Sequence, residues 1–285
     1  MGHRLTYGEN KMFKGFELTL SESDFLSNYG LYSELLRKTQ EKIADKFNEV
    51  LLNDGKINAD KIMEEWFPSG QYHVFISHSH KDLELAEQLA NWLYEKFKLT
   101  SFLDSHVWGY ANNLLKDLNE KYARNGEETY AYEPAISNAA HVYLMLSTAL
   151  AEVIDKSECL FFINTENALE NMQIEGSQAK SRTASPWIMH ELKTSAMIRR
   201  RYSSDREESV TESAGLESLE KSAGFSFSVP TEHLFKLDQS NLSKWAKDCC
   251  VEGNSVGFRR WLLDEKKEFD ALDVLYTLSM IDEDR

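Results

Sequence analysis

Short apolar runs alternate with amphipathic segments from Tyr72 onward, which is the pattern of a parallel α/β sheet. Residues 72–76 form an apolar run that predicts a strand buried on both faces. Residues 82–97 carry apolar side chains at helical spacing after Asp82, an expected N-cap. Residues 100–103 predict the next strand. A polar turn at residues 77–81 therefore sits where a strand ends and a helix begins, the usual ligand-binding edge of such a sheet.

The same reading predicts the rest of the chain. Ser185 and Pro186 are expected as N-cap and first residue of a helix. A long, mostly apolar helix is expected at 135–156, and its apolar run at 139–154 is expected to be a buried core element. The remaining predictions are a helix at 112–122, a polar loop or insertion at 124–134, a strand at 159–163, an irregular segment at 165–184, a helix at 186–201, an exposed segment at 203–222, edge strands at 225–229 and 234–237, and helices at 241–249 and 256–281.

The N-terminal residues differ from this alternation. Residues 16–20 predict a short strand or an extended arm, and residues 31–52 and 59–66 predict helices. We therefore divide the chain into a helical N-terminal extension (1–70), an α/β domain with a long insertion between its second and third strands (71–240), and C-terminal helices packed on that domain (241–285).

Composition narrows the class of protein. The chain has 285 residues and a formal net charge of −15, which argues against a nucleic-acid backbone as partner. No apolar run reaches membrane-spanning length, and the N-terminus lacks the apolar core of a signal peptide. Three cysteines, two of them adjacent, make no disulfide framework. A cytoplasmic protein that binds neither nucleic acid nor membrane is expected.

One helix start carries candidate chemistry. Trp187 and Glu191 are four residues apart and share a helix face. A carboxylate near the positive end of a helix dipole can stay ionised, accept ribose hydroxyls and stabilise an oxocarbenium-like transition state. The alternative is that Trp187 belongs to the core and Glu191 is a solvated surface acid.

Metal and nucleotide motifs are weak or absent. His73, His78 and His80 with Asp82 could suggest a metal site, but His73 belongs to the strand and no second cluster completes the ligands. His190 and Glu191 do not continue into His-Glu-x-x-His. Gly-x-Gly-x-x-Gly, Walker A and Gly-x-Ser-x-Gly are also missing. We expect no metal and no bound cofactor.

Four segments together resemble bacterial Toll/interleukin-1 receptor (TIR) domains. They are residues 74–82, residues 102–105 with Trp108 and Gly109, residues 159–164, and residues 185–192. The resemblance implies a flavodoxin-like, five-stranded parallel sheet of order 2-1-3-4-5, with a switch point beside the first strand. The longer stretch between the second and third strands and the terminal helices depart from minimal TIR domains.

The resemblance also implies a function. Enzymatic TIR domains cleave the nicotinamide–ribose bond of NAD+, and signal-producing members act in Thoeris-type antiphage defence. Carried onto this sequence, Glu191 would be catalytic and Trp187 part of the pocket wall. The remaining implied pocket residues are Phe75, Ser77 and His78 in the first turn, and Ser105 and Trp108 in the second loop.

The implied partners are NAD+ as substrate, a second copy of the chain in an oligomer formed on activation, a phage-derived trigger, and a separate effector that senses the product. The products are nicotinamide with either ADP-ribose or a cyclic or modified ADP-ribose, and the sequence does not choose between them. The alternative function is a non-catalytic TIR module that acts as a signalling adaptor by self-association.

Overall fold

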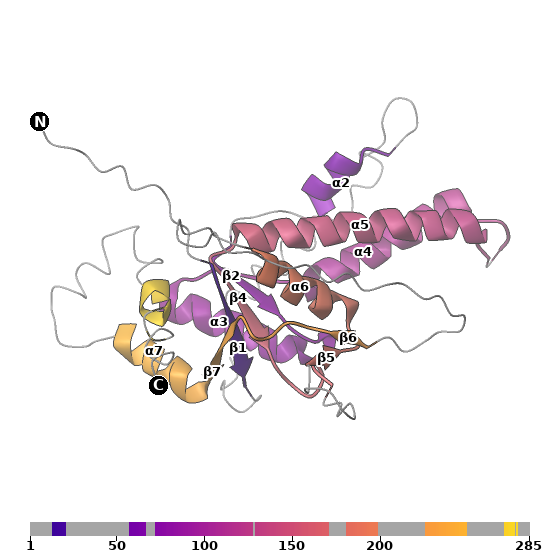
Figure 1. The fold of residues 1–285 in the computed structure, drawn as a ribbon. Helices are drawn as coiled ribbons and strands as arrows, with labels where there is room; N and C mark the ends of the chain where they lie inside the picture. Colours follow the sequence, from indigo (N-terminus) through magenta and orange to yellow (C-terminus); the bar gives the residue numbers. More distant parts are fainter. Residues whose placement is uncertain are drawn as a thin grey trace, which may run out of the picture.

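The computed structural model describes residues 13–20, 57–66, 72–127, 129–170, 181–198, 226–249, 271–276 and 278, with the backbone alone at 64–66 and 106–110. Its centre is a five-stranded, all-parallel sheet of order β3-β2-β4-β1-β7 (Figure 1). The strands are β1 (Lys14–Thr19), β2 (Val74–Ser77), β3 (Ser101–Leu103), β4 (Cys159–Ile163) and β7 (Leu234–Asp238). The predicted α/β class with a five-stranded parallel sheet is confirmed.

The order of the strands differs from the expectation in one respect. β1 pairs with β4 on one side and β7 on the other, so it lies inside the sheet. It fills the fourth place of a 2-1-3-4-5 order in which β2 is counted first. The expectation that the residues before position 70 add only helices outside the sheet is therefore wrong for Lys14–Thr19. The choice between strand and extended arm is decided in favour of a strand.

Helices cover both faces of the sheet (Figure 1). One face packs against α3 (Leu83–Phe97), α7 (Gln239–Cys249) and the helical residues 271–276. The other face packs against α2 (Ala59–Trp66), α4 (Ser105–Leu118), α5 (Tyr132–Lys156) and α6 (Pro186–Met197). The result is a three-layer α/β arrangement.

Alternation along β2 decides which side chains meet which face. Val74 and Ile76 lie in the cluster with α3, whereas Phe75 points to the opposite cluster and stacks on Phe102, with ring centroids 5.3 Å apart. Because successive strand side chains alternate, Ser77 points to the same face as Phe75. This places the last residue of β2 on the side of α6.

The segment between β3 and β4 is helical for most of its length. It runs through α4, a π-helical turn η4 (Asn119–Ala123) and the 25-residue helix α5. The loop expected at 124–134 is shorter, because α5 begins at Tyr132; Pro134 is tolerated in its first turn, where backbone N–H groups have no intrahelical partner. The ends of α4 and α5 extend beyond the sheet (Figure 1).

Two predicted caps have different outcomes. Ser185 caps α6 as expected, since its side chain accepts a hydrogen bond from the Ile188 N–H at 3.3 Å, and Pro186 follows. Asp82 makes no capping hydrogen bond on α3. Its carboxylate instead accepts hydrogen bonds from Thr165 Oγ1 at 2.5 Å and Asn167 Nδ2 at 2.7 Å. It therefore ties the turn after β2 to the loop after β4.

Several other expectations meet the structure only in part. The strand expected at 225–229 is reduced to β6 (Phe227–Ser228), which pairs antiparallel with β5 (Arg182–Thr183) in a separate sheet. The predicted segments 31–52 and 203–222, and most of 256–281, lie outside the described residues. No helix among the described residues is long and apolar enough to cross a membrane.

Candidate functional site

A buried polar cluster lies where β2 and β3 end. Ser77 is the last residue of β2, His78 follows it, and Asp104 and Ser105 follow β3. Glu191 reaches the same place from α6. Parallel strands bring their carboxyl ends to one edge of the sheet, so residues distant in sequence meet here.

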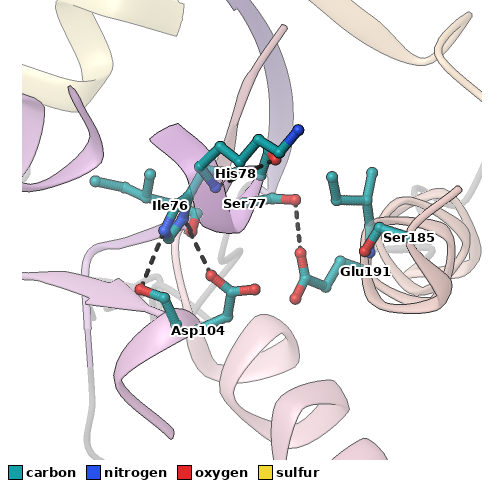
Figure 2. Close-up of polar contacts among 10 residues, drawn as sticks. Ile76, Ser77, His78, Asp104, Ser185 and Glu191 are labelled. Carbon is teal, nitrogen blue, oxygen red and sulfur yellow. Dashed lines mark hydrogen bonds and ion pairs between the residues drawn. The ribbon is translucent and has the colours of Figure 1, made fainter. Parts of the chain in front are cut away.

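The contact that joins the two halves of the cluster is a hydrogen bond. The Ser77 hydroxyl donates to Glu191 Oε2 at 2.6 Å, across 114 positions of sequence (Figure 2). Both side chains are completely buried. No described residue forms a hydrogen bond to the second oxygen, Oε1, within normal geometry. The helix start that carries the candidate carboxylate is therefore docked on the turn after β2.

His78 connects the two strand ends. Its Nδ1 lies 3.1 Å from Asp104 Oδ1 and 3.3 Å from the Ile76 carbonyl oxygen (Figure 2). Its Nε2 lies 3.1 Å from Ser105 Oγ. Because both neighbours of Nδ1 are acceptors, Nδ1 carries a hydrogen. The ring is thereby fixed in the cluster.

Asp104 lies between His78 and Glu191 (Figure 2). Burial, followed by the negative charge of Asp104, raises the pKa of Glu191 well above its ordinary value. The Ser77 hydroxyl acts in the opposite direction, whereas the nearby Asp104 carboxyl group again favours the protonated acid. Two carboxyl groups in such contact are most stable when they share one proton.

Both predictions for the Glu191 environment need correction. The expectation that the carboxylate stays ionised is wrong for this closed arrangement, because burial and Asp104 favour the protonated form. The alternative of a solvated surface acid is also wrong, since Glu191 has no exposed surface. A fully buried carboxyl group that costs free energy to ionise is a recognised mark of a functional site, although structural networks also produce it.

The other predicted site residues are placed as follows. Ser105 belongs to the cluster through His78. Phe75 lies in the core beneath the cluster. Trp187 is half-buried one helical turn before Glu191, and its ring centroid is 5.9 Å from that of Tyr143 on α5. Trp108 falls within α4, but its side chain lies outside the described part.

Asp104 is the member of the cluster that the sequence did not assign to the site. The available signal was its position, directly after a predicted strand that neighbours β2. An acidic residue directly after a strand is also typical of a turn, so its position alone did not mark Asp104 as a member of the site. Only the register of β3 beside β2 places it next to His78.

A cavity of about 580 Å³ lies further along the same edge of the sheet. It is lined by Thr19 and Leu20 after β1, by residues 164–167 after β4, and by Asp82 and Leu85 at the start of α3. The described lining residues include no Lys, Arg or His. Glu191 is not among them, so the turn at 77–82 has the buried cluster at its beginning and the cavity at its end.

A metal is not indicated by the described residues, which contain no group of three or more His, Cys, Asp or Glu side chains that could hold one. His73, considered above as a ligand, bonds to Thr100 instead: its Nδ1 lies 2.7 Å from Thr100 Oγ1.

Comparison with protein-family models, curated proteins and solved structures found no match to this chain.

Proposed function

We propose that this protein is a TIR-like enzyme that cleaves the nicotinamide–ribose bond of NAD+. The observation that carries the proposal is the Ser77–Glu191 hydrogen bond of 2.6 Å. It joins the two segments on which the resemblance to TIR domains depends most, the turn after β2 and the start of α6. The resemblance gives Glu191 the catalytic role, and the contact supports it because a residue of each motif is present in one cluster.

Glu191 would act on the charge that develops as the bond breaks. Nicotinamide leaves with the bonding electron pair and becomes neutral, and positive charge develops at the ribose C1′. An ionised carboxylate in a water-poor site stabilises that charge far more than it would in bulk water. Water, an adenine nitrogen or a ribose hydroxyl then attacks C1′, which gives ADP-ribose or a cyclic product.

The closed cluster must open before this reaction. Glu191 is fully buried and therefore inaccessible to substrate, and burial together with Asp104 raises its pKa and so favours the protonated form. Separation of Glu191 from Ser77 and Asp104 would expose the carboxyl group and lower its pKa, which allows it to ionise. An enzyme that is inactive until assembled, as the resemblance implies, is compatible with this resting state.

The cavity supports a substrate of dinucleotide size at the same edge. Its volume of about 580 Å³ is within the usual range for small-molecule sites. The side-chain amide groups of Asn164 and Asn167 donate to Glu17 and Asp82, which leaves their amide oxygens as acceptors suited to sugar hydroxyls. The described lining has no cationic side chain, so it suits a ribose better than a phosphate.

The alternative is a non-catalytic module that acts by self-association. The complete burial of Glu191 favours it, because an adaptor has no need of an accessible acid. The two functions differ in whether the protein, alone or with a phage-derived trigger, consumes NAD+. We further propose that the protein acts in the cytoplasm in antiphage defence, with a separate effector that senses the product.

The test is nicotinamide release from NAD+, followed by chromatography with mass spectrometry of the ribosyl product. The wild-type chain, Glu191→Gln and Glu152→Gln are compared, with and without phage infection of the expressing cells. Glu152 is a matched control because it is a partly exposed acid on α5, with 47% of its side chain accessible. Release by the wild type and Glu152→Gln but not by Glu191→Gln supports the proposal. Equal release by all three removes Glu191 from the chemistry.

A further inference from the structure

Ser105, His78 and Asp104 have the arrangement of a serine–histidine–aspartate triad. The Ser105 hydroxyl oxygen lies 3.1 Å from Nε2 of His78. On the other side of the same ring, Asp104 Oδ1 lies 3.1 Å from Nδ1 (Figure 2). A serine at one ring nitrogen and a carboxylate beside the other is the constellation in which a histidine activates a serine nucleophile. Such triads are recognised by geometry, and the order of their members along the chain varies.

The hydrogen of the His78 ring is on the nitrogen that this role requires. Nδ1 lies 3.3 Å from the Ile76 carbonyl oxygen, which can only accept, so Nδ1 carries the hydrogen. In the neutral ring Nε2 is then an acceptor, and the Ser105 hydroxyl donates to it. The serine proton is therefore already directed at the base that would remove it.

A second serine–histidine contact in the structure has the opposite direction. The Ser195 hydroxyl donates to the Leu192 carbonyl oxygen at 3.0 Å, and it also lies 2.8 Å from His233 Nε2. Because a hydroxyl has a single hydrogen, His233 is the donor in that contact. Ser195 is also only 3% exposed. A buried serine that accepts from a histidine is a structural contact, and Ser105 differs from it in both respects.

Asp104 is placed to stabilise the charge that His78 acquires with the serine proton. Its side chain is 6% exposed and that of His78 is 0% exposed, so water weakens their attraction little. Burial and the charge of Asp104 raise the pKa of Glu191, so Glu191 is the acid of that pair that retains a proton. Asp104 is therefore available as the anion beside His78.

The fold presents Ser105 at the outside of the cluster. Ser105 is half-buried, whereas His78 and Asp104 are 3% and 4% exposed. Ser105 is the first residue of α4, directly after the turn that ends β3, the outer strand of the sheet. The nucleophile of α/β hydrolases occupies the same kind of strand-to-helix turn, although their Gly-x-Ser-x-Gly sequence is missing here. The hydroxyl can be reached without entry into the core.

The start of α4 also supplies donors for an oxyanion. The first N–H groups of a helix have no partner within it, and the Asp104 side chain does not cap those of α4. The backbone N–H of residue 106, directly after the serine, corresponds to the usual oxyanion donor next to a nucleophile. The positive end of the helix dipole favours negative charge at the same place. Nucleophile, base and oxyanion donors together define a site for acyl transfer.

We propose that Ser105 is a nucleophile that hydrolyses carboxylic esters, with His78 as its general base and Asp104 as the group that stabilises the charged histidine. Ser105 Oγ bonds to the ester carbonyl carbon while its proton passes to His78 Nε2. The bond from that carbon to the alcohol oxygen then breaks, and His78 gives the proton to the departing alcohol. Water attacks the acyl-serine in the same way and gives a proton to Nε2. The bond to Oγ breaks, Ser105 recovers that proton, and the carboxylic acid leaves.

The overall change is ester plus water to acid plus alcohol. No step uses NAD+ or the Glu191 carboxyl group. The activity therefore stands or falls separately from nicotinamide release.

The test is labelling of the purified full-length chain by a fluorophosphonate, followed by mass spectrometry of the intact protein and of its peptides. The serine oxygen displaces fluoride from phosphorus, and the phosphonyl group stays on the residue. We expect a label at Ser105 in the wild type and none on Ser105→Ala. Labelling of His78→Gln should be slower by about a hundredfold or more, because the general base is lost. Circular dichroism checks that the variants fold.

Ser147→Ala is the matched control. Ser147 is also a half-buried serine beside a histidine, with its hydroxyl oxygen 3.2 Å from His190 Nε2. That nitrogen lies 3.0 Å from the Ser147 carbonyl oxygen and therefore carries a hydrogen, so it cannot take the serine proton. Ser147→Ala should be labelled at the wild-type rate. It should also release p-nitrophenol from p-nitrophenyl acetate as the wild type does, whereas Ser105→Ala should not.

Three results overturn the proposal. The first is folded wild-type protein that takes no label or carries it on another residue. The second is labelling of Ser105 at the same rate in folded His78→Gln, because a reaction that needs no base needs no triad. The third is release of p-nitrophenol that Ser105→Ala and the wild type catalyse equally.

Discussion

Glu191→Gln should make the folded protein more stable at neutral and alkaline pH, although it removes a hydrogen-bonded side chain. Burial and the charge of Asp104 raise the pKa of Glu191 well above its ordinary value. The folded state therefore retains a proton that the unfolded state has already released. Gln has nearly the same shape, can accept the Ser77 hydrogen bond through its amide oxygen, and never ionises.

The sign and the size of the stability difference between wild type and Glu191→Gln follow from proton linkage. Above the ordinary pKa of a glutamate, the folded wild type binds one more proton than the unfolded chain, so its stability falls as pH rises. The slope is about 1.4 kcal/mol per pH unit and continues until the pH passes the raised pKa. Below the ordinary value, both states are protonated and this loss is absent. Glu191→Gln lacks this pH-dependent loss of stability, because glutamine does not ionise.

The assay is urea unfolding, followed by circular dichroism, at half-unit steps from pH 4.5 to pH 8. We expect wild type and Glu191→Gln to be nearly equal at the acid end and to diverge with rising pH, the variant being the more stable. Glu152→Gln should follow the wild type, because Glu152 is largely solvated. A difference between wild type and Glu191→Gln that does not change with pH would refute the reasoning about the protonated acid.

Three further changes have expected outcomes. Asp104→Asn should lower the raised pKa of Glu191, so the fall in stability should end at a lower pH than in the wild type, as the same urea series would show. Trp245→Ala should lower the free energy of unfolding in urea by about 3–5 kcal/mol. Trp245 is fully buried, its ring centroid lies 4.1 Å from that of Phe97, and its Nε1–H donates to the Ala271 carbonyl oxygen at 2.8 Å. Unchanged stability would contradict the assignment of Trp245 to the core. Gly15→Ala should cost about 1–3 kcal/mol, because its new Cβ would collide with the buried Leu234 side chain of β7, and a thermal melt equal to that of the wild type would argue against the β1–β7 pairing.

Local sequence determines some elements of this fold completely. The helices Ala59–Trp66 and Leu83–Phe97 and the strand Cys159–Ile163 are predicted with their observed bounds. Each has a strong apolar period or run. The neighbouring residues also end it clearly, so little depends on the rest of the chain.

Other elements depend on tertiary structure. Nothing in the pattern of Lys14–Thr19 tells that it pairs with β4 and β7, because pairing is decided by partners far away in sequence. Asp82 has the residue type of an N-cap, yet Thr165 and Asn167 compete successfully for its carboxylate. The apolar character of α5 indicated burial, but its N-terminal half exposes Tyr132, Ile136 and Leu144, because that half extends beyond the sheet (Figure 1).

Most residues of the candidate site were predictable from the sequence, but the electrostatics of the site were not. Motifs pointed to Ser77, His78, Ser105 and Glu191, and the structure brings these four together. The role of Asp104, and with it the protonated state of Glu191, depends on a contact between strand ends. A sequence cannot report that distance, so the electrostatics of the site required the fold.

The most direct test of the central claim is nicotinamide release from NAD+ by the purified chain and in extracts of phage-infected cells. We expect release by the wild type that Glu191→Gln abolishes while its folding, by circular dichroism and urea unfolding, is intact. Release that is undiminished in folded Glu191→Gln would contradict the account of Glu191. The absence of any release from the wild type under both conditions would instead support a non-catalytic, self-associating module.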